Sequence, residues 1–155
     1  MRIGYGYDVH RLKQGRECIL CGVKIPCGFG PDGHSDADVP VHALIDALLG
    51  AAALGDIGKM FPDSDERLRG ADSIELLKTA YALLLEKDYR LSNADITIVL
   101  EVPRLAGYID KMRDTIAGAL GVPCDAVSVK ATTEEKLGFT GAGLGIAASA
   151  VVLIE

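Results

Sequence analysis

The sequence predicts one domain of the mixed α/β (α+β) class, spanning residues 1–155, in which helices cover one face of a mixed β-sheet. Hydrophobic periodicity gives three strands, two helices, a strand, a helix and two strands. This order differs from a doubly wound fold, and no Rossmann or P-loop glycine pattern is present. The last strand, 144–154, is apolar on both faces, so both need cover. Three helices suffice for one face, and we expect a second subunit on the other.

The composition is that of a globular protein, with 49% hydrophobic and 25% charged residues. No apolar run reaches membrane-spanning length and the N-terminus lacks a signal-peptide core, which predicts a cytoplasmic protein with no membrane partner. A net charge of −6 without basic clusters argues against nucleic-acid binding. An anionic small molecule is still compatible with this charge, provided that a metal, helix N-termini or a few local cations hold it.

Four cysteines, Cys18, Cys21, Cys27 and Cys124, include a single CxxC. A structural zinc site normally needs four ligands at matched spacings. We therefore expect free thiols in a reducing compartment, with metal binding by the cysteines as the weaker alternative.

The first strand is expected over residues 2–9. The period of two places Asp8 and His10 on one side, together with Gly4 and Gly6. A strand can thus present a carboxylate next to an imidazole, and the glycines allow another backbone or a ligand to approach closely. All three histidines of the chain lie in its first 42 residues, each close to an aspartate.

Residues 17–27 read as two short strands around Gly22, and a Gly/Pro loop over 28–33 leads to the central helix. Asp38 is the expected cap before Pro40, and Gly55 the expected C-terminal cap. The buried stripe of this helix comprises Val41, Leu44, Ile45, Leu48, Leu49 and Ala52.

His42 and Asp46 lie four residues apart on this helix, hence on one face. A carboxylate at that spacing can accept the proton of the histidine nitrogen that does not bind a metal. The alternative interpretation is a helix cap followed by an ordinary polar pair. The helix alone does not decide between the two.

The remaining elements follow the same patterns. A polar loop over 55–65 precedes a helix from Asp72 or Ser73 to about Lys87. The last part of the chain is expected to hold a strand at 94–102, a helix at 105–120 closed by Gly121, a strand at 127–131, a polar loop at 132–141 and the strand at 144–154.

Asp8, His10 and His42 form a possible ligand set of two imidazoles and one carboxylate. Such a set leaves one position open on a tetrahedral, zinc-like ion, which is typical of catalytic metal sites. The acidic Glu135 suits a harder ion such as Mg²⁺ bound to phosphate oxygens. Phosphoryl transfer needs mainly positioning and charge neutralisation, which metals, a loop hydroxyl and helix amides supply.

These residues belong to motifs that run through the whole chain. The segments are Arg2-Ile3-Gly4, Asp8-Val9-His10, His34-Ser35-Asp36, 42–50, 55–58, Phe61-Pro62-Asp63, 130–133, Glu135 and Leu137-Gly138-Phe139. In identity and spacing, the set resembles the 2-C-methyl-D-erythritol 2,4-cyclodiphosphate synthases, which act in the non-mevalonate isoprenoid pathway.

The resemblance implies a homotrimer whose sheets surround a central channel, with active sites between adjacent subunits. The implied reaction is an attack of the 2-phosphate of a cytidine diphosphate substrate on its β-phosphate, which expels CMP and closes a cyclic diphosphate. The implied cofactors are Zn²⁺ on Asp8, His10 and His42, and Mg²⁺ or Mn²⁺ on the substrate diphosphate with help from Glu135.

The same resemblance implies the other roles. His34 and Thr133 would stabilise the transition state, Ser35 and Asp63 would hold the methylerythritol part, and Asp56 and Gly58 the ribose. The further substrate-binding residues are Ile57, Phe61, Asp65, Leu100, Pro103, Arg104, Leu105, Ala106, Ala131, Thr132 and Phe139, those of 100–106 and 131–133 coming from the neighbouring subunit. Asp46 is expected behind His42.

The sequence departs from the family pattern at three positions. Glu134 stands where many members have Thr or Ser, Ala142 where many have a basic residue, and Leu144 where many have an acidic residue.

Two other functions stay open. A metal-dependent phosphohydrolase would use the same three ligands but release a linear phosphate. A non-enzymatic trimeric metal-binding module would close the fourth ligand position and release no CMP.

Overall fold

The computed structural model describes residues 1–62 and 64–155. Its strands are β1 (Arg2–Gln14), β2 (Cys18–Leu20), β3 (Val23–Ile25), β4 (Phe29–Pro31), β5 (Leu91–Val99), β6 (Val127–Thr132) and β7 (Gly145–Ile154). Its α-helices are α1 (Val39–Ala51), α2 (Ile57–Met60), α3 (Ser73–Leu85), α4 (Ile109–Leu120) and α5 (Gly138–Gly141). Single 3₁₀ turns occur at Glu66–Leu68, Ala106–Tyr108 and Cys124–Ala126.

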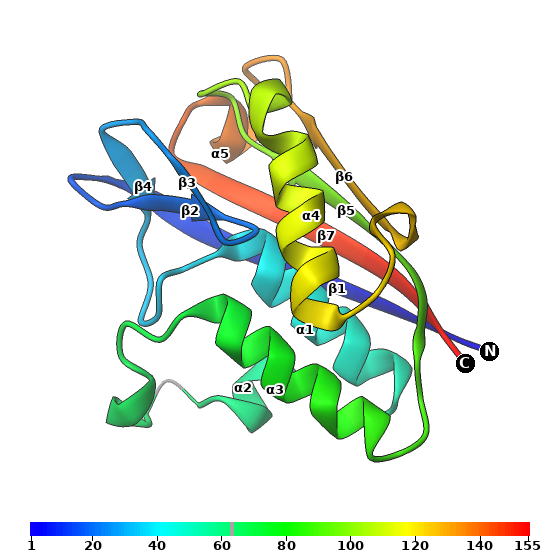
Figure 1. Cartoon of the computed structure of the whole chain (residues 1–155). Coiled ribbons are helices and arrows are strands. Elements are labelled where there is room, and N and C mark those ends of the chain that lie inside the picture. The colour runs from blue at the N-terminus through cyan, green and yellow to red at the C-terminus, as the bar shows by residue number, and fades with distance from the viewer. Residues whose placement is uncertain (63) are drawn as a thin grey trace.

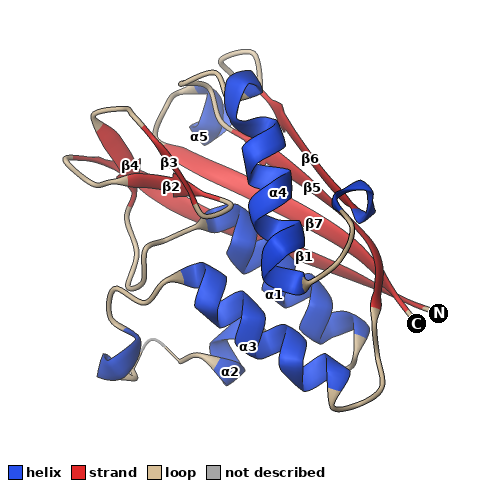
Figure 2. Cartoon of the chain, viewed as in Figure 1, coloured by secondary structure: helices blue, strands red, loops and turns tan. Residues whose placement is uncertain are grey.

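The main sheet has the strand order β4-β1-β7-β5-β6, and β2 pairs with β3 in a separate hairpin. Only β5 and β6 pair in parallel, through the crossover helix α4, and the other pairs of the main sheet are antiparallel. α1, α3 and α4 lie on one side of the sheet, and the two termini lie close together (Figures 1 and 2). The predicted mixed sheet with helices on one face is therefore confirmed.

The core forms between the sheet and these helices. The inward residues of β7, such as Ile146, Val152 and Ile154, are fully buried, as are Leu44, Ile45 and Leu48 of α1. On the opposite face of the sheet, β1 leaves Ile3, Tyr5, Tyr7 and Val9 exposed by 72, 64, 50 and 45%. The helices of the chain itself therefore cover one face of the sheet, while β1 leaves apolar residues exposed on the other face.

Some predicted boundaries are wrong. β1 continues to Gln14 because its end pairs with β4, so the expected 28–33 loop contains a strand. The expected 55–65 loop contains α2, the 132–141 loop contains α5, and β5 ends at Val99 rather than at residue 102. Leu144 precedes β7 and is 64% exposed, instead of belonging to the buried face.

The predicted cap at Gly55 is also wrong. α1 ends at Ala51, and Ala53 adopts the left-handed conformation with φ of 57°. The N–H groups of Ala53 and Leu54 donate to the carbonyls of Gly50 and Leu49, which is the hydrogen-bond pattern of a Schellman motif. An alanine thus occupies the position that usually favours glycine, and Gly55 belongs to the turn before α2.

Asp38 joins the start of α1 to the β2–β3 hairpin. This fully buried side chain accepts hydrogen bonds from the backbone N–H groups of Cys21, Gly22 and Val41. Burial raises its pKa to about 7, although the N–H bonds from Gly22 and Cys21 act in the opposite direction. The predicted N-cap is confirmed, and it also fixes where α1 begins relative to the hairpin.

No helix among the described residues is long and apolar enough to cross a membrane.

Candidate metal centre and active site

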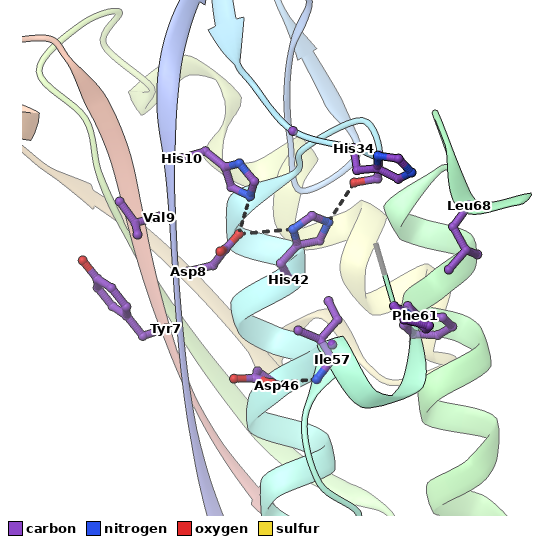
Figure 3. Close-up of a pocket in the computed structure, with 14 residues that line it drawn as sticks. Tyr7, Asp8, Val9, His10, His34, His42, Asp46, Ile57, Phe61 and Leu68 are labelled. Carbon is purple, nitrogen blue, oxygen red and sulfur yellow. Dashed lines mark hydrogen bonds and ion pairs between the residues drawn. The ribbon is translucent and has the colours of Figure 1, made fainter. Parts of the chain in front are cut away.

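Asp8 and His10 project from β1 toward α1, as the two-residue period predicts, and His42 meets them from the first turn of that helix (Figure 3). Two glycines make the approach possible. A Cβ atom on Gly4 would lie 1.9 Å from the carbonyl oxygen of Ala47, and one on Gly6 would lie 2.0 Å from that of Ala43. Only glycine at these positions lets α1 lie this close to β1.

The three side chains meet at one oxygen. Oδ2 of Asp8 lies 3.2 Å from Nε2 of His10 and 3.1 Å from Nδ1 of His42, and the possible ligand atoms of the trio all lie within 4.8 Å of one another. The two rings are arranged edge to face, with centroids 5.8 Å apart. Burial raises the pKa of Asp8, but hydrogen bonds and charge from His10 and His42 outweigh it and lower that pKa below its usual range.

The ring nitrogens that face away from this oxygen have their own partners. Nδ1 of His10 lies 2.8 Å from the backbone carbonyl oxygen of Asp32, which can only accept, so we assign a proton to this nitrogen. Nε2 of His42 lies 2.9 Å from the hydroxyl of Ser73 and 3.2 Å from that of Ser35. When a metal ion takes the place of any protons on the inner nitrogens, the neutral rings keep their protons on the outer nitrogens and three ligand atoms converge on the metal. That arrangement fits a metal ion bound by Asp8, His10 and His42.

The expected contact between Asp46 and His42 is wrong. The side chain of Asp46 accepts a hydrogen bond from the backbone N–H of Ile57, at 2.9 Å (Figure 3). The outer nitrogen of His42 lies instead within hydrogen-bond distance of the hydroxyls of Ser35 and Ser73. An i,i+4 spacing makes such a contact possible, but here α2 packs beside α1 and takes the carboxylate. Asp46 therefore holds the first residue of α2.

A pocket of about 330 Å³ surrounds the trio. Besides Asp8, His10 and His42, it is lined by six other residues expected from the sequence: His34, Ser35, Asp46, Ile57, Gly58 and Phe61. The sequence analysis missed five further lining residues, Tyr7, Val9, Gly33, Pro62 and Leu68. None of the described lining residues is Lys or Arg, so an anion held here needs another source of positive charge.

Two more expected residues lie near this pocket without lining it. Asp56 caps α2 by accepting from the N–H of Lys59, at 2.8 Å. Asp65 bonds to Arg67, whose hydrogen bonds lower the pKa of that carboxyl to about 2. Asp63 lies outside the described residues.

None of the other expected residues that the structure describes lines this pocket. Thr133 and Glu135 follow β6, which the strand order places three strands from β1, at about 14 Å across the sheet. The Thr133 hydroxyl donates to Glu135 at 2.9 Å, and both residues are exposed. The members of this second group are Leu100, Pro103, Arg104, Leu105, Ala106, Ala131, Thr132, Thr133, Glu135 and Phe139. Glu135 is not part of the trio that can hold a metal within one chain.

The departure at Glu134 has a local explanation. Its carboxylate accepts a hydrogen bond from the hydroxyl of Thr140, a buried residue of α5 in the same chain. That contact directs Glu134 toward α5. Ala142 and Leu144 follow α5, and both are exposed.

Comparison with known proteins gives a consistent result. The model of the YgbB family matches residues 1–155. The 2-C-methyl-D-erythritol 2,4-cyclodiphosphate synthase of Moorella thermoacetica is 62% identical over 154 residues, which cover 99% of this chain and 94% of that protein.

Solved structures share the fold. A 2C-methyl-D-erythritol-2,4-cyclodiphosphate synthase in its CDP-bound form has a TM-score of 0.91 at 40% identity, covering 99% of this chain and 100% of that one. The bifunctional IspDF from Campylobacter jejuni has a TM-score of 0.96 at 42% identity, and the match covers 99% of this chain but 42% of the longer protein. With a family model that matches from end to end, the chain belongs to the YgbB family.

Proposed function

We propose that this chain converts 4-diphosphocytidyl-2-C-methyl-D-erythritol 2-phosphate to 2-C-methyl-D-erythritol 2,4-cyclodiphosphate and CMP. The curated relatives are named for the synthesis of this cyclic product, and a relative of the same fold is described in a CDP-bound form. One observation carries the proposal. Three acceptor atoms converge in a pocket whose described lining contains no Lys or Arg, which suits a site where a metal ion and a phosphorylated substrate meet.

Asp8, His10 and His42 are the residues that would hold this metal, with Zn²⁺ the expected ion for one carboxylate and two imidazoles. A bound divalent ion supplies Lewis-acid stabilisation of phosphate oxygens. His10 is oriented by the carbonyl of Asp32, and Gly33 leaves room for its ring, because a Cβ there would lie 2.8 Å from Cε1 of His10. Both features hold the inner nitrogen toward the pocket.

In the proposed reaction, an oxygen of the 2-phosphate bonds to the β-phosphorus and the bond from that phosphorus to the α-phosphate oxygen breaks. CMP leaves with the bond electrons. His34 lines the pocket with Nε2 buried and without a hydrogen-bond partner among the described residues, so this nitrogen is available to a phosphate oxygen. The hydroxyl of Ser35 lies at the same wall. These two groups position the substrate and stabilise charge.

We also propose that three copies assemble, with their sheets around a central channel. The supporting feature is the uncovered face of the sheet, where the register of β1 with β7 places Tyr5 opposite Val151. Both are exposed in the single chain, as are Ile3, Tyr7 and Val9. An apolar strip of this size normally marks a protein interface. A neighbouring copy would also bring the second group, with Thr133 and Glu135, to the metal trio of the first.

The free protein is expected to have three times the 16.3 kDa mass of one chain in light scattering at micromolar concentration. Tyr5→Asp should shift the mass toward that of one chain, because it places a charge in the centre of the proposed interface. Asp88→Asn, a change at an exposed turn after α3, serves as the control. A monomeric wild type with full activity would contradict the trimer.

The reaction itself is tested by incubating the protein with the cytidyl substrate, Zn²⁺ and Mg²⁺, and identifying the products by mass spectrometry. CMP together with the cyclic diphosphate is the expected result. A linear phosphate would indicate a phosphohydrolase instead. Metal binding without CMP would indicate a non-enzymatic module.

Asp46→Ala is expected to raise the KM for the cytidyl substrate while zinc affinity stays as in the wild type. The reason is that Asp46 holds the N–H of Ile57, and hence the start of α2, rather than His42. A hydrogen bond from a backbone N–H to a charged acceptor is worth about 1.5–3 kcal/mol, so the rise is expected at roughly 10- to 100-fold. Steady-state kinetics and zinc titration on the same sample separate an effect on KM from an effect on zinc affinity. A loss of zinc would instead support the expected contact between Asp46 and His42.

We propose a cytoplasmic location for the enzyme. The structure contains four free cysteines, Cys18, Cys21, Cys27 and Cys124, which is compatible with a reducing compartment.

A further inference from the structure

Behind His42, on the side away from the metal trio, lies a buried serine, which the sequence indicated only as the start of a helix. Ser73 is the first residue of α3 and is completely buried. Its hydroxyl oxygen lies 2.9 Å from Nε2 of His42. The same residue makes two contacts with Asp36, through its backbone N–H to Oδ2 at 2.9 Å and through its hydroxyl to Oδ1.

Asp36 is held firmly as well. Its Oδ1 also accepts from the backbone N–H of Asp38, at 3.2 Å, and its own N–H donates to the carbonyl of Ala71. The carboxylate therefore joins the segment before α1 to the start of α3. Both of its oxygens accept hydrogen bonds from N–H or O–H groups.

The direction of the hydrogen bonds follows from a count of protons. A serine hydroxyl has one hydrogen, and here it points at the Asp36 carboxylate. The oxygen of Ser73 can then only accept from His42, so Nε2 must carry a proton. A metal ion can bind Nδ1, the nitrogen that lies 3.1 Å from Asp8 within the metal trio, without removing that proton.

We propose that Asp36 and Ser73 form a positioning pair that fixes the orientation and the tautomer of His42 for metal binding. The inference rests on the proposed function, because it takes the trio to be the metal site of the enzyme. The hydroxyl of Ser35 lies farther from Nε2, at 3.2 Å, and its oxygen accepts from the N–H of Ala37. Ser73 is the stronger partner because the carboxylate polarises its hydroxyl.

Ser73→Ala and Asp36→Asn are the variants that test the pair. Each should weaken zinc binding by roughly 10- to 100-fold in competition with a chromogenic chelator, which is the usual effect of losing a group that orients a metal-bound histidine. Nitrogen-15 NMR of the histidines gives a second readout that needs no variant. The zinc-free wild type should show His42 protonated at Nε2.

Asp72→Ala is the matched control. Asp72 caps the same helix by accepting from the N–H of Ile74, but it is exposed and does not contact His42. It should lower the thermal midpoint through α3 without changing zinc affinity. If Ser73→Ala does not fold, Asp36→Asn and the wild-type NMR spectrum still decide the matter.

Each outcome has a defined meaning. Wild-type zinc affinity in both variants, or a His42 whose Nε2 carries no proton in the zinc-free wild type, would overturn the positioning pair while the proposed function stands. A wild type that binds no zinc would overturn the metal site, and the pair with it. If Ser73→Ala and Asp72→Ala weaken zinc binding equally, the cause is a general loosening of α3. This result would also overturn the positioning pair, even with the expected His42 tautomer in the wild type.

Discussion

His42→Ala is expected to lose bound zinc and activity together while the chain stays folded and assembled. The ring supplies one of three metal-binding atoms, and its loss should lower zinc affinity by more than the roughly 100-fold upper value for an outer group that only orients a ligand. The fold should persist because buried residues of α1, such as Leu44 and Leu48, lie on other faces of the helix. Metal analysis, circular dichroism and turnover on one preparation measure all three properties.

His34→Ala provides the matched comparison. His34 lines the same pocket but is not one of the three residues that can hold the metal. This variant should keep its zinc and lose about 10²- to 10³-fold in kcat, the range found when a group that stabilises transition-state charge is removed. A His42→Ala protein that retained one zinc per chain at wild-type affinity would show that the ligand assignment is wrong.

The metal trio could be predicted because local rules determine most of it. The period of two in β1 puts Asp8 and His10 side by side, and Pro40 after the Asp38 cap places His42 in the first helical turn. Gly4 and Gly6 were recognised as places for close approach, and the structure shows that α1 is what approaches. The chemistry of this part of the site is therefore accessible from short stretches of sequence.

The partners behind the trio could not be predicted in this way. Ser73 is 31 residues from His42 and 37 from Asp36, and nothing in the local pattern of α3 indicates a contact with either. The i,i+4 spacing suggested Asp46 because only local geometry was available. The tertiary position of α2 then gave Asp46 a different partner.

The fold shows the same division. Hydrophobic alternation found the long strands and helices, but β4 spans only Phe29–Pro31 and forms because the end of β1 is available for pairing. The end of α1 was misplaced because a left-handed conformation was expected at a glycine, whereas Ala53 adopts it. Short elements and caps of this kind depend on neighbours that the sequence does not place.

The expected site residues fall into two separate groups, and this separation predicts that two inactive variants can complement each other. The metal trio lies on β1 and α1, whereas Thr133 and Glu135 follow β6, three strands away. If sites form between subunits, a chain without its trio can still supply the second group to a neighbour. Co-expression of His42→Ala with Glu135→Ala, each inactive alone, should then restore activity.

The size of the recovery can be stated in advance. In randomly mixed trimers, a site is complete when an intact trio from the Glu135→Ala chain meets an intact second group from the His42→Ala chain, which applies to about one quarter of the sites. Co-expression of His42→Ala with His10→Ala is the control and should stay inactive, because both chains lack the same half. Activity near a quarter of wild type in the first mixture alone would support sites shared between subunits. No recovery in proven mixed trimers would place the whole site within one chain. Glu135 would then need a role outside that site, because the strand order separates β6, which Glu135 follows, from β1.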